Sequence, residues 1–75
     1  MNVLIVENEK PAIVGLSKLI IKIDGSINIV GTTESVESTI NWFQNNALPE
    51  LIFLDIQLDD GLCFEIFEKL PLNVL

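Results

Sequence analysis

Residues 51–61 read LIFLDIQLDDG, in which an apolar run, residues 51–54, is followed at once by an acid, Asp55. Two further apolar runs occupy residues 3–6 and 27–30, and the first of these is also followed by an acid, Glu7. Each run has the length of a strand, and continuous apolarity is typical of strands that are covered on both faces. The sequence therefore predicts three buried strands of a parallel sheet.

Helical spacing fills the intervals between these runs. Pro11 suits the first turn of one helix and Gly25 its end, Ser35 is the expected N-cap of a second, and Pro71 ends a third. The apolar stripes of the three helices are Ala12, Ile13, Leu16, Leu19, Ile20 and Ile23; Val36, Ile40, Phe43 and Ala47; and Leu62, Ile66, Phe67 and Leu70. The order β-α-β-α-β-α predicts an α/β fold with right-handed crossovers and helices on both faces of the sheet.

Composition limits what the chain can be. Its 75 residues form at most one domain, residues 1–75, and 49% of them are apolar. The net charge of −7, with no arginine or histidine, argues against binding to nucleic acid or an anionic membrane. No apolar run could span a bilayer, and the N-terminus lacks the basic region of a signal peptide. Cys63, the single cysteine, excludes an internal disulfide and fits the cytoplasm.

Acidic and amide side chains collect where the predicted strands end. Glu7, Asn8 and Glu9 follow the first strand, and Asp55 follows the third. In an open parallel sheet the carboxyl ends of strands bind ligands where the strand order reverses, which brings these groups together if the first strand is central. Oxygen ligands suit Mg²⁺, and one carboxylate can attack phosphorus to form an aspartyl phosphate. Acidic residues at such junctions are more often solvated loop residues or helix caps, so spacing alone does not favour the chemical interpretation.

Residues 3–11, VLIVENEKP, resemble the opening of response-regulator receiver domains, and residues 51–61 resemble their phosphorylation-site strand and loop. The wording Asp-Ile-Gln-Leu, followed by Gly61-Leu62, is most similar to regulators with a LytTR-type DNA-binding domain. The resemblance covers essentially the whole chain. It implies an incomplete flavodoxin-like receiver fold, with a parallel sheet of three strands in the order 2-1-3.

The resemblance also implies a function, namely phosphorelay signal transduction by a module that is not an enzyme. Asp55 falls on the position that accepts a phosphoryl group from a sensor histidine kinase. Glu7 and Asn8 fall on the acidic pair that binds Mg²⁺, and the backbone carbonyl of Gln57 falls on a third metal ligand beside Asp55. Gly61 falls on the glycine that lets the loop turn into the third helix.

The chain departs from the family pattern in two ways. Asn8 stands where an aspartate usually binds magnesium, so the metal should bind more weakly; Asn8 could equally be the N-cap of the first helix. The hydroxyl residue after a fourth strand and the lysine after a fifth, which the family uses for switching, are absent, and residues 72–75 are expected to begin a fourth strand.

Val14 and Ile21, opposite the main stripe of the first helix, could contact the kinase.

Other functions are open from the sequence. A magnesium-dependent phosphotransfer enzyme or nuclease could place acids at the same strand ends, but such sites commonly use an Asp-x-Asp pair, and Gln57 stands two residues after Asp55. A truncated, inactive fragment could act only as an interaction module. Whichever function holds, the absence of the last two strands of the receiver order is expected to leave the strand at residues 51–54 as an uncharged edge that pairs with a second copy.

Five further side chains are expected to be structural and to take no part in the chemistry. Asp59 and Asp60 are expected to be loop acids without chemistry. Cys63 and Phe67 are expected in the core, and Trp42 is expected to be a partly covered surface residue.

Overall fold

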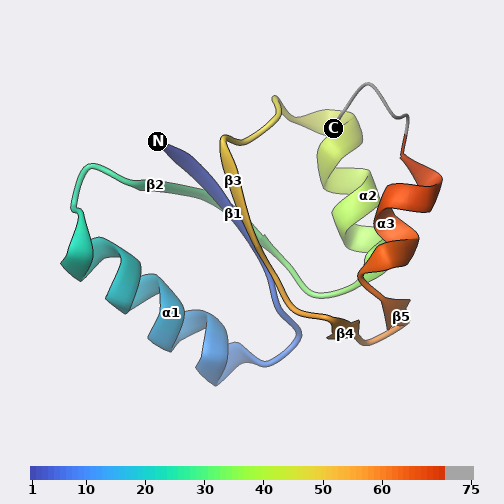
Figure 1. The fold of residues 1–75 in the computed structure, drawn as a ribbon, viewed down its shortest axis with the longest axis horizontal. Coiled ribbons are helices and arrows are strands. Elements are labelled where there is room, and N and C mark those ends of the chain that lie inside the picture. Colours follow the sequence, from blue (N-terminus) through green and yellow to red (C-terminus); the bar gives the residue numbers. More distant parts are fainter. Residues whose placement is uncertain (71–75) are drawn as a thin grey trace.

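The computed structural model describes residues 1–70 and has an α/β fold (Figure 1). Its elements are β1 (Asn2–Val6), α1 (Lys10–Ile23), β2 (Asn28–Thr33), α2 (Val36–Asn45), β3 (Leu51–Leu54), β4 (Gln57–Leu58), β5 (Gly61–Leu62) and α3 (Phe64–Lys69). Strands β2, β1 and β3 form a parallel sheet in that order, with β1 in the centre. This confirms the predicted 2-1-3 order and is consistent with a flavodoxin-like arrangement.

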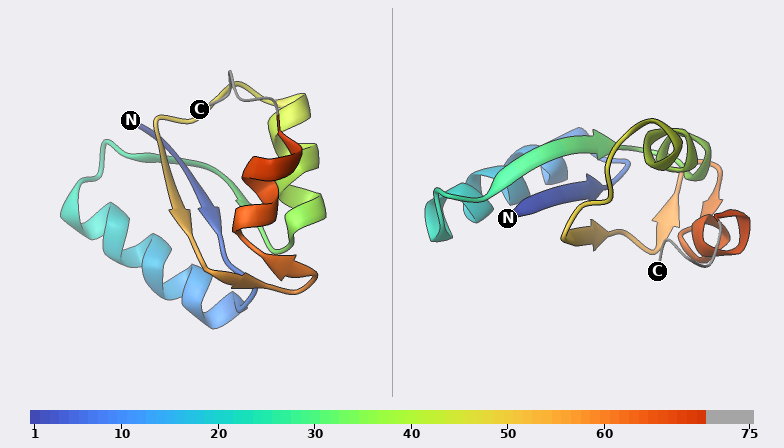
Figure 2. Two further views of the ribbon diagram at one scale, coloured as in Figure 1. Left: turned by 45° about the vertical axis from the view of Figure 1, so that its right-hand side comes forward. Right: turned by 90° about the horizontal axis from the view of Figure 1, so that it is seen from above.

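The central strand divides the core into two layers, one on each face of the sheet (Figure 2). Val3 and Ile5 of β1 are fully buried against Ile20 of α1. Leu4 and Val6 point to the other face and pack with buried residues of α2 and α3. Because successive side chains of a strand alternate between faces, a strand covered on both sides must be apolar throughout. This explains why β1 is a continuous apolar run.

The helix ends follow the sequence signals. Pro11 lies in the first turn of α1, and Asp24 follows its last residue. Ser35 is the N-cap of α2, as predicted: its hydroxyl accepts the N–H of Ser38 at 3.0 Å, and the Ser38 hydroxyl accepts the N–H of Ser35 at 3.0 Å. This reciprocal pair fixes where α2 begins.

Strand β2 is longer than predicted and contains an irregularity. It covers residues 28–33, whereas the apolar run ended at residue 30. Its register with β1 shifts, so that Val3 pairs with Ile29 and Leu4 with Gly31. At Gly31 the indole of Trp42 lies against the strand, where an added Cβ would be 2.5 Å from the indole Nε1. Trp42 is half-buried and packs against the core, so it is partly covered, as predicted.

The segment after β3 differs from the predicted loop and helix. Strands β4 and β5 form an antiparallel hairpin, in which Gln57 pairs with Leu62 and Leu58 with Gly61. Leu62, assigned to the third helical stripe by its spacing, lies instead in β5 and is exposed, and α3 begins at Phe64. Gly61, predicted to let the loop turn into this helix, lies instead in β5 and has a positive φ of 154°.

Several apolar residues of the predicted stripes are not covered. Leu19 and Ile23 of α1 are 53% and 75% exposed, and Ala47 lies beyond the end of α2. Val14 and Ile21 are exposed, as predicted, and Cys63 is buried in the core. No helix within residues 1–70 has the length and apolar character needed to cross a bilayer. The expected fourth strand at residues 72–75 lies outside the described residues.

Candidate functional site

The sheet places Glu7 and Asp55 side by side. Val6 and Leu54, the last residues of β1 and β3, are partners in the parallel register. The N–H of Asp55 donates to the carbonyl of Val6 at 2.9 Å, and the N–H of Glu7 donates to the carbonyl of Thr33 at 2.9 Å. The hydrogen-bonding pattern thus continues one residue past the strands and fixes the backbone of both acids at the carboxyl edge of the sheet.

The two carboxyl groups influence each other. Partial burial raises the pKa of Glu7 above its ordinary value of 4.5, and the neighbouring Asp55 carboxyl raises that pKa further through a hydrogen bond and through charge repulsion. The negative charge of Glu9 acts in the same direction. Apolar side chains lie next to Glu7, since Leu16 and Phe53 line a hollow of about 310 Å³ that Glu7 and Asp55 also border. Two neighbouring carboxylates repel each other, and a cation placed between them relieves that repulsion.

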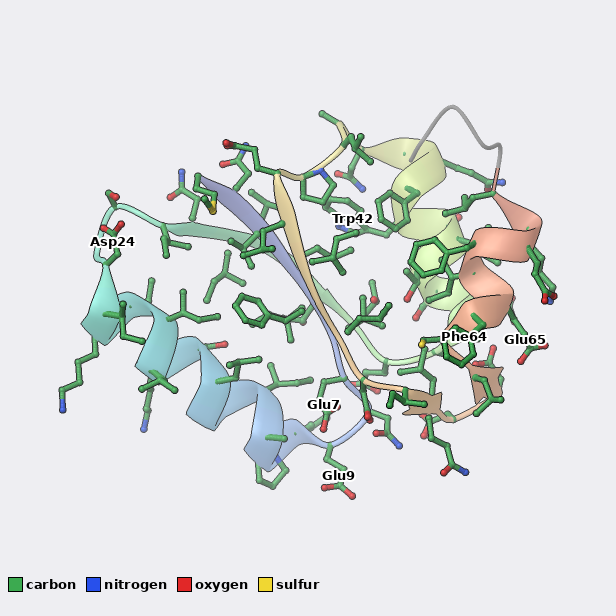
Figure 3. The ribbon with its side chains drawn as sticks, viewed as in Figure 1. Glu7, Glu9, Asp24, Trp42, Phe64 and Glu65 are labelled. Carbon is green, nitrogen blue, oxygen red and sulfur yellow. The ribbon has the colours of Figure 1, made fainter. Side chains whose placement is uncertain are left out.

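The four residues predicted for the site line one hollow of about 610 Å³. It is bordered by Glu7, Asn8, Glu9, Asp55, Gln57, Leu58 and Asp59. Figure 3 shows Glu7 just beyond the end of β1, and Glu9 beside the first turn of α1. The residues therefore come from two stretches that are distant in the sequence: the β1–α1 loop, and the segment that runs from the end of β3 into the β4–β5 hairpin.

Asn8 is not the N-cap of α1, which was one of its two predicted roles. The cap position belongs to Glu9, which makes no capping hydrogen bond with its side chain. Instead, the Nδ2 of Asn8 donates to the carboxylate of Asp59 at 3.2 Å across the hollow. Because the amide nitrogen is used in this way, the amide oxygen is the atom that Asn8 can offer to a cation.

Asp59 and Asp60 are more than solvated loop acids. Asp59 holds Asn8, as described above. Asp60 accepts the N–H of Val36 at 2.6 Å and that of Glu37 at 3.0 Å, and these bonds lower its pKa. Sequence spacing could not reveal these contacts, because each joins residues more than twenty positions apart.

The ligands that the site could offer a metal are all oxygens: the carboxylates of Glu7 and Asp55, the amide of Asn8 and the carbonyl of Gln57. Such a set fits the chemistry of a hard cation that retains several waters, as Mg²⁺ does. No group of three or more His, Cys, Asp or Glu side chains within residues 1–70 is arranged to hold a metal ion. A cation here would therefore depend on two carboxylates and on neutral oxygens.

Comparison of the chain with protein-family models, curated proteins and solved structures gives no match. The similarity to receiver domains therefore rests on the two motifs at residues 3–11 and 51–61. The order of the strands and the meeting of the two motifs at one sheet edge are independent of that similarity.

Proposed function

We propose that the chain is a receiver module that accepts a phosphoryl group on Asp55 in a phosphorelay. The observation that supports this most is the position of Glu7 and Asp55 directly after adjacent parallel strands, where both border the same hollow. Paired acids at this edge of an open sheet are suited to binding a cation together with an anionic group. Gln57, which borders the same hollow, supplies a further oxygen.

In the proposed reaction, an oxygen of the Asp55 carboxylate attacks the phosphorus of a phosphohistidine or a small phosphodonor. The new O–P bond forms as the bond from phosphorus to the donor breaks, and the electron pair leaves with the donor. Glu7 contributes a carboxylate beside Asp55, and Asn8 contributes a neutral amide oxygen. The side chains of Glu7, Asn8 and Asp55 and the carbonyl of Gln57 would hold Mg²⁺, and the bound ion would neutralise negative charge on the transferring group.

The partner in this proposal is a sensor histidine kinase in the cytoplasm, a compartment that suits the buried thiol of Cys63. The exposed Val14 and Ile21 of α1 offer it an apolar contact. The net charge of −7 gives this segment no attraction for DNA or an anionic membrane.

A second function, an interaction module without phosphoryl transfer, is favoured by one observation. Apolar side chains of α1 remain exposed, including Leu19 and Ile23. In that case substitution of Asp55 would leave partner binding unchanged, whereas a receiver should bind its kinase or its output differently once Asp55 is phosphorylated.

The test is labelling by phosphoramidate in the presence of Mg²⁺, followed by intact-mass measurement. The wild-type chain should gain one acid-labile phosphoryl group, and Asp55→Asn should gain none. Asp59→Asn is the matched control, because Asp59 borders the same hollow and an amide oxygen there can still accept the bond from Asn8. Labelling that persists in Asp55→Asn, or that is lost equally in both variants, would contradict the assignment.

A further inference from the structure

The β4–β5 hairpin meets α2 in two ways: Leu58 is buried in the same core cluster as Val36, and the side chain of Asp60 makes the polar link. Asp60, in the turn of the hairpin, uses one carboxylate oxygen to accept the N–H of Val36 and the other to accept the N–H of Glu37. These are the first two amides of α2, which have no partner within the helix. The third amide, that of Ser38, donates to the hydroxyl of Ser35. The start of α2 is thus capped by Ser35 locally and by Asp60 from a distant segment.

The hairpin needs such an attachment because it is very short. Each strand has two residues, and isolated two-stranded hairpins are at best marginally stable. Its base is closed by the N–H of Cys63, which donates to the carbonyl of Ile56 at 2.8 Å. Its turn is held by Asp60 to α2 and by Asp59 to Asn8.

The position of this hairpin matters to the proposed site. Gln57 is the first residue of β4, two positions after Asp55, and both border the hollow that contains Glu7. We infer that Asp60 is a positioning residue: by binding the start of α2 it sets the place of the hairpin, and so of the Gln57 carbonyl relative to Asp55. This inference rests on the proposed function.

The two N–H bonds lower the pKa of Asp60, so its carboxylate is charged when it holds the helix. A charged acceptor also suits the positive end of the helix dipole. A purely structural role, that of a helix cap, would give the same contacts, so the test must separate loss of the cap from loss of the hairpin position.

Ser35→Ala and Asp60→Ala make that separation. Both remove a cap from the same end of α2, but only Asp60→Ala also breaks the polar link between α2 and the hairpin. Removing groups that orient metal ligands typically weakens metal binding about 10–100-fold. We expect a loss of this size for Mg²⁺ in Asp60→Ala by calorimetry, a smaller loss in Asp60→Asn, which keeps one acceptor, and no change in Ser35→Ala.

Amide hydrogen exchange without metal supplies a second measurement that does not depend on phosphorylation. Exchange across residues 57–62 should be faster in Asp60→Ala than in Ser35→Ala. Equal exchange and equal Mg²⁺ affinity in the two variants would overturn the inference, because Asp60 would then be only a cap. Faster exchange in Asp60→Ala, with no labelling of the wild-type chain, would support the role of Asp60 in placing the hairpin and contradict the proposed function.

Discussion

Substituting alanine at Gly31 tests the packing between β2 and α2. A Cβ at this position would lie 2.5 Å from Nε1 and 3.1 Å from Cε2 of Trp42, and 3.4 Å from Cδ1 of Leu4. Favourable contacts between such atoms occur at about 3.5–4.0 Å, so the indole would have to retreat by about 1 Å. The ring packs edge-to-face on Phe43 with 5.5 Å between ring centroids, so a shift of the indole also disturbs that contact.

Overpacking of this kind typically costs about 1–3 kcal/mol. A chain of this size has a total stability of roughly 4–11 kcal/mol, so Gly31→Ala should remove a substantial part of it. For a domain of 60–100 residues, each kcal/mol lowers the melting temperature by about 4–8 °C, which predicts a loss of roughly 4–24 °C. Thermal and urea unfolding followed by far-UV circular dichroism would measure both quantities.

The control is the double variant Gly31→Ala with Trp42→Phe, in which the smaller ring leaves space for the new methyl group. The two substitutions should be coupled by about 0.5–3 kcal/mol, with the double variant more stable than the sum of the single effects predicts. If Gly31→Ala unfolds within about 0.5 kcal/mol of the wild-type chain, the close approach of Trp42 to β2 is wrong.

Three other predictions concern the site and the sheet edge. Stability should fall as the pH rises from 4.5 through the raised pKa of Glu7, because the folded chain holds that proton more tightly than the unfolded chain; Asp55→Asn should flatten the fall in urea titrations at successive pH values. Asn8→Asp should bind Mg²⁺ more tightly by calorimetry, although it loses the bond donated to Asp59, and equal affinities would exclude Asn8 as a ligand. Among residues 1–70 only β1 pairs with β3, whose side chains carry no charge, so the chain should self-associate through that edge. Leu51→Lys, at an exposed position of β3, should weaken this association in sedimentation runs at rising concentration, and a wild-type chain that stays monomeric throughout would refute it.

The sequence was sufficient for the sheet because its signals are local. The apolar run at residues 51–54 coincides with β3, and the acids that follow β1 and β3 lie at one edge because parallel strands all end there. Ser35 was recognisable as a cap because the group it binds is three residues away. In each case the pattern and its physical cause lie within one element or follow from the order of elements.

Contacts between distant segments could not be predicted in this way. The bond from Asn8 to Asp59 and the bonds from α2 to Asp60 depend on the position of the hairpin relative to the sheet and to α2. The spacing of Leu62 fits a helix, but its pairing with Gln57 places it in β5. Tertiary pairing therefore overrides helical periodicity in the short segment between β3 and α3.

The most direct test of the proposed function is to identify the modified residue chemically. An aspartyl phosphate is an acyl phosphate, which borohydride reduces to an alcohol, so a phosphorylated aspartate becomes homoserine in the peptide. After labelling with phosphoramidate and Mg²⁺, reduction and peptide sequencing by mass spectrometry should find homoserine at position 55. Homoserine at another acid, or at none, would contradict the claim that Asp55 accepts the phosphoryl group.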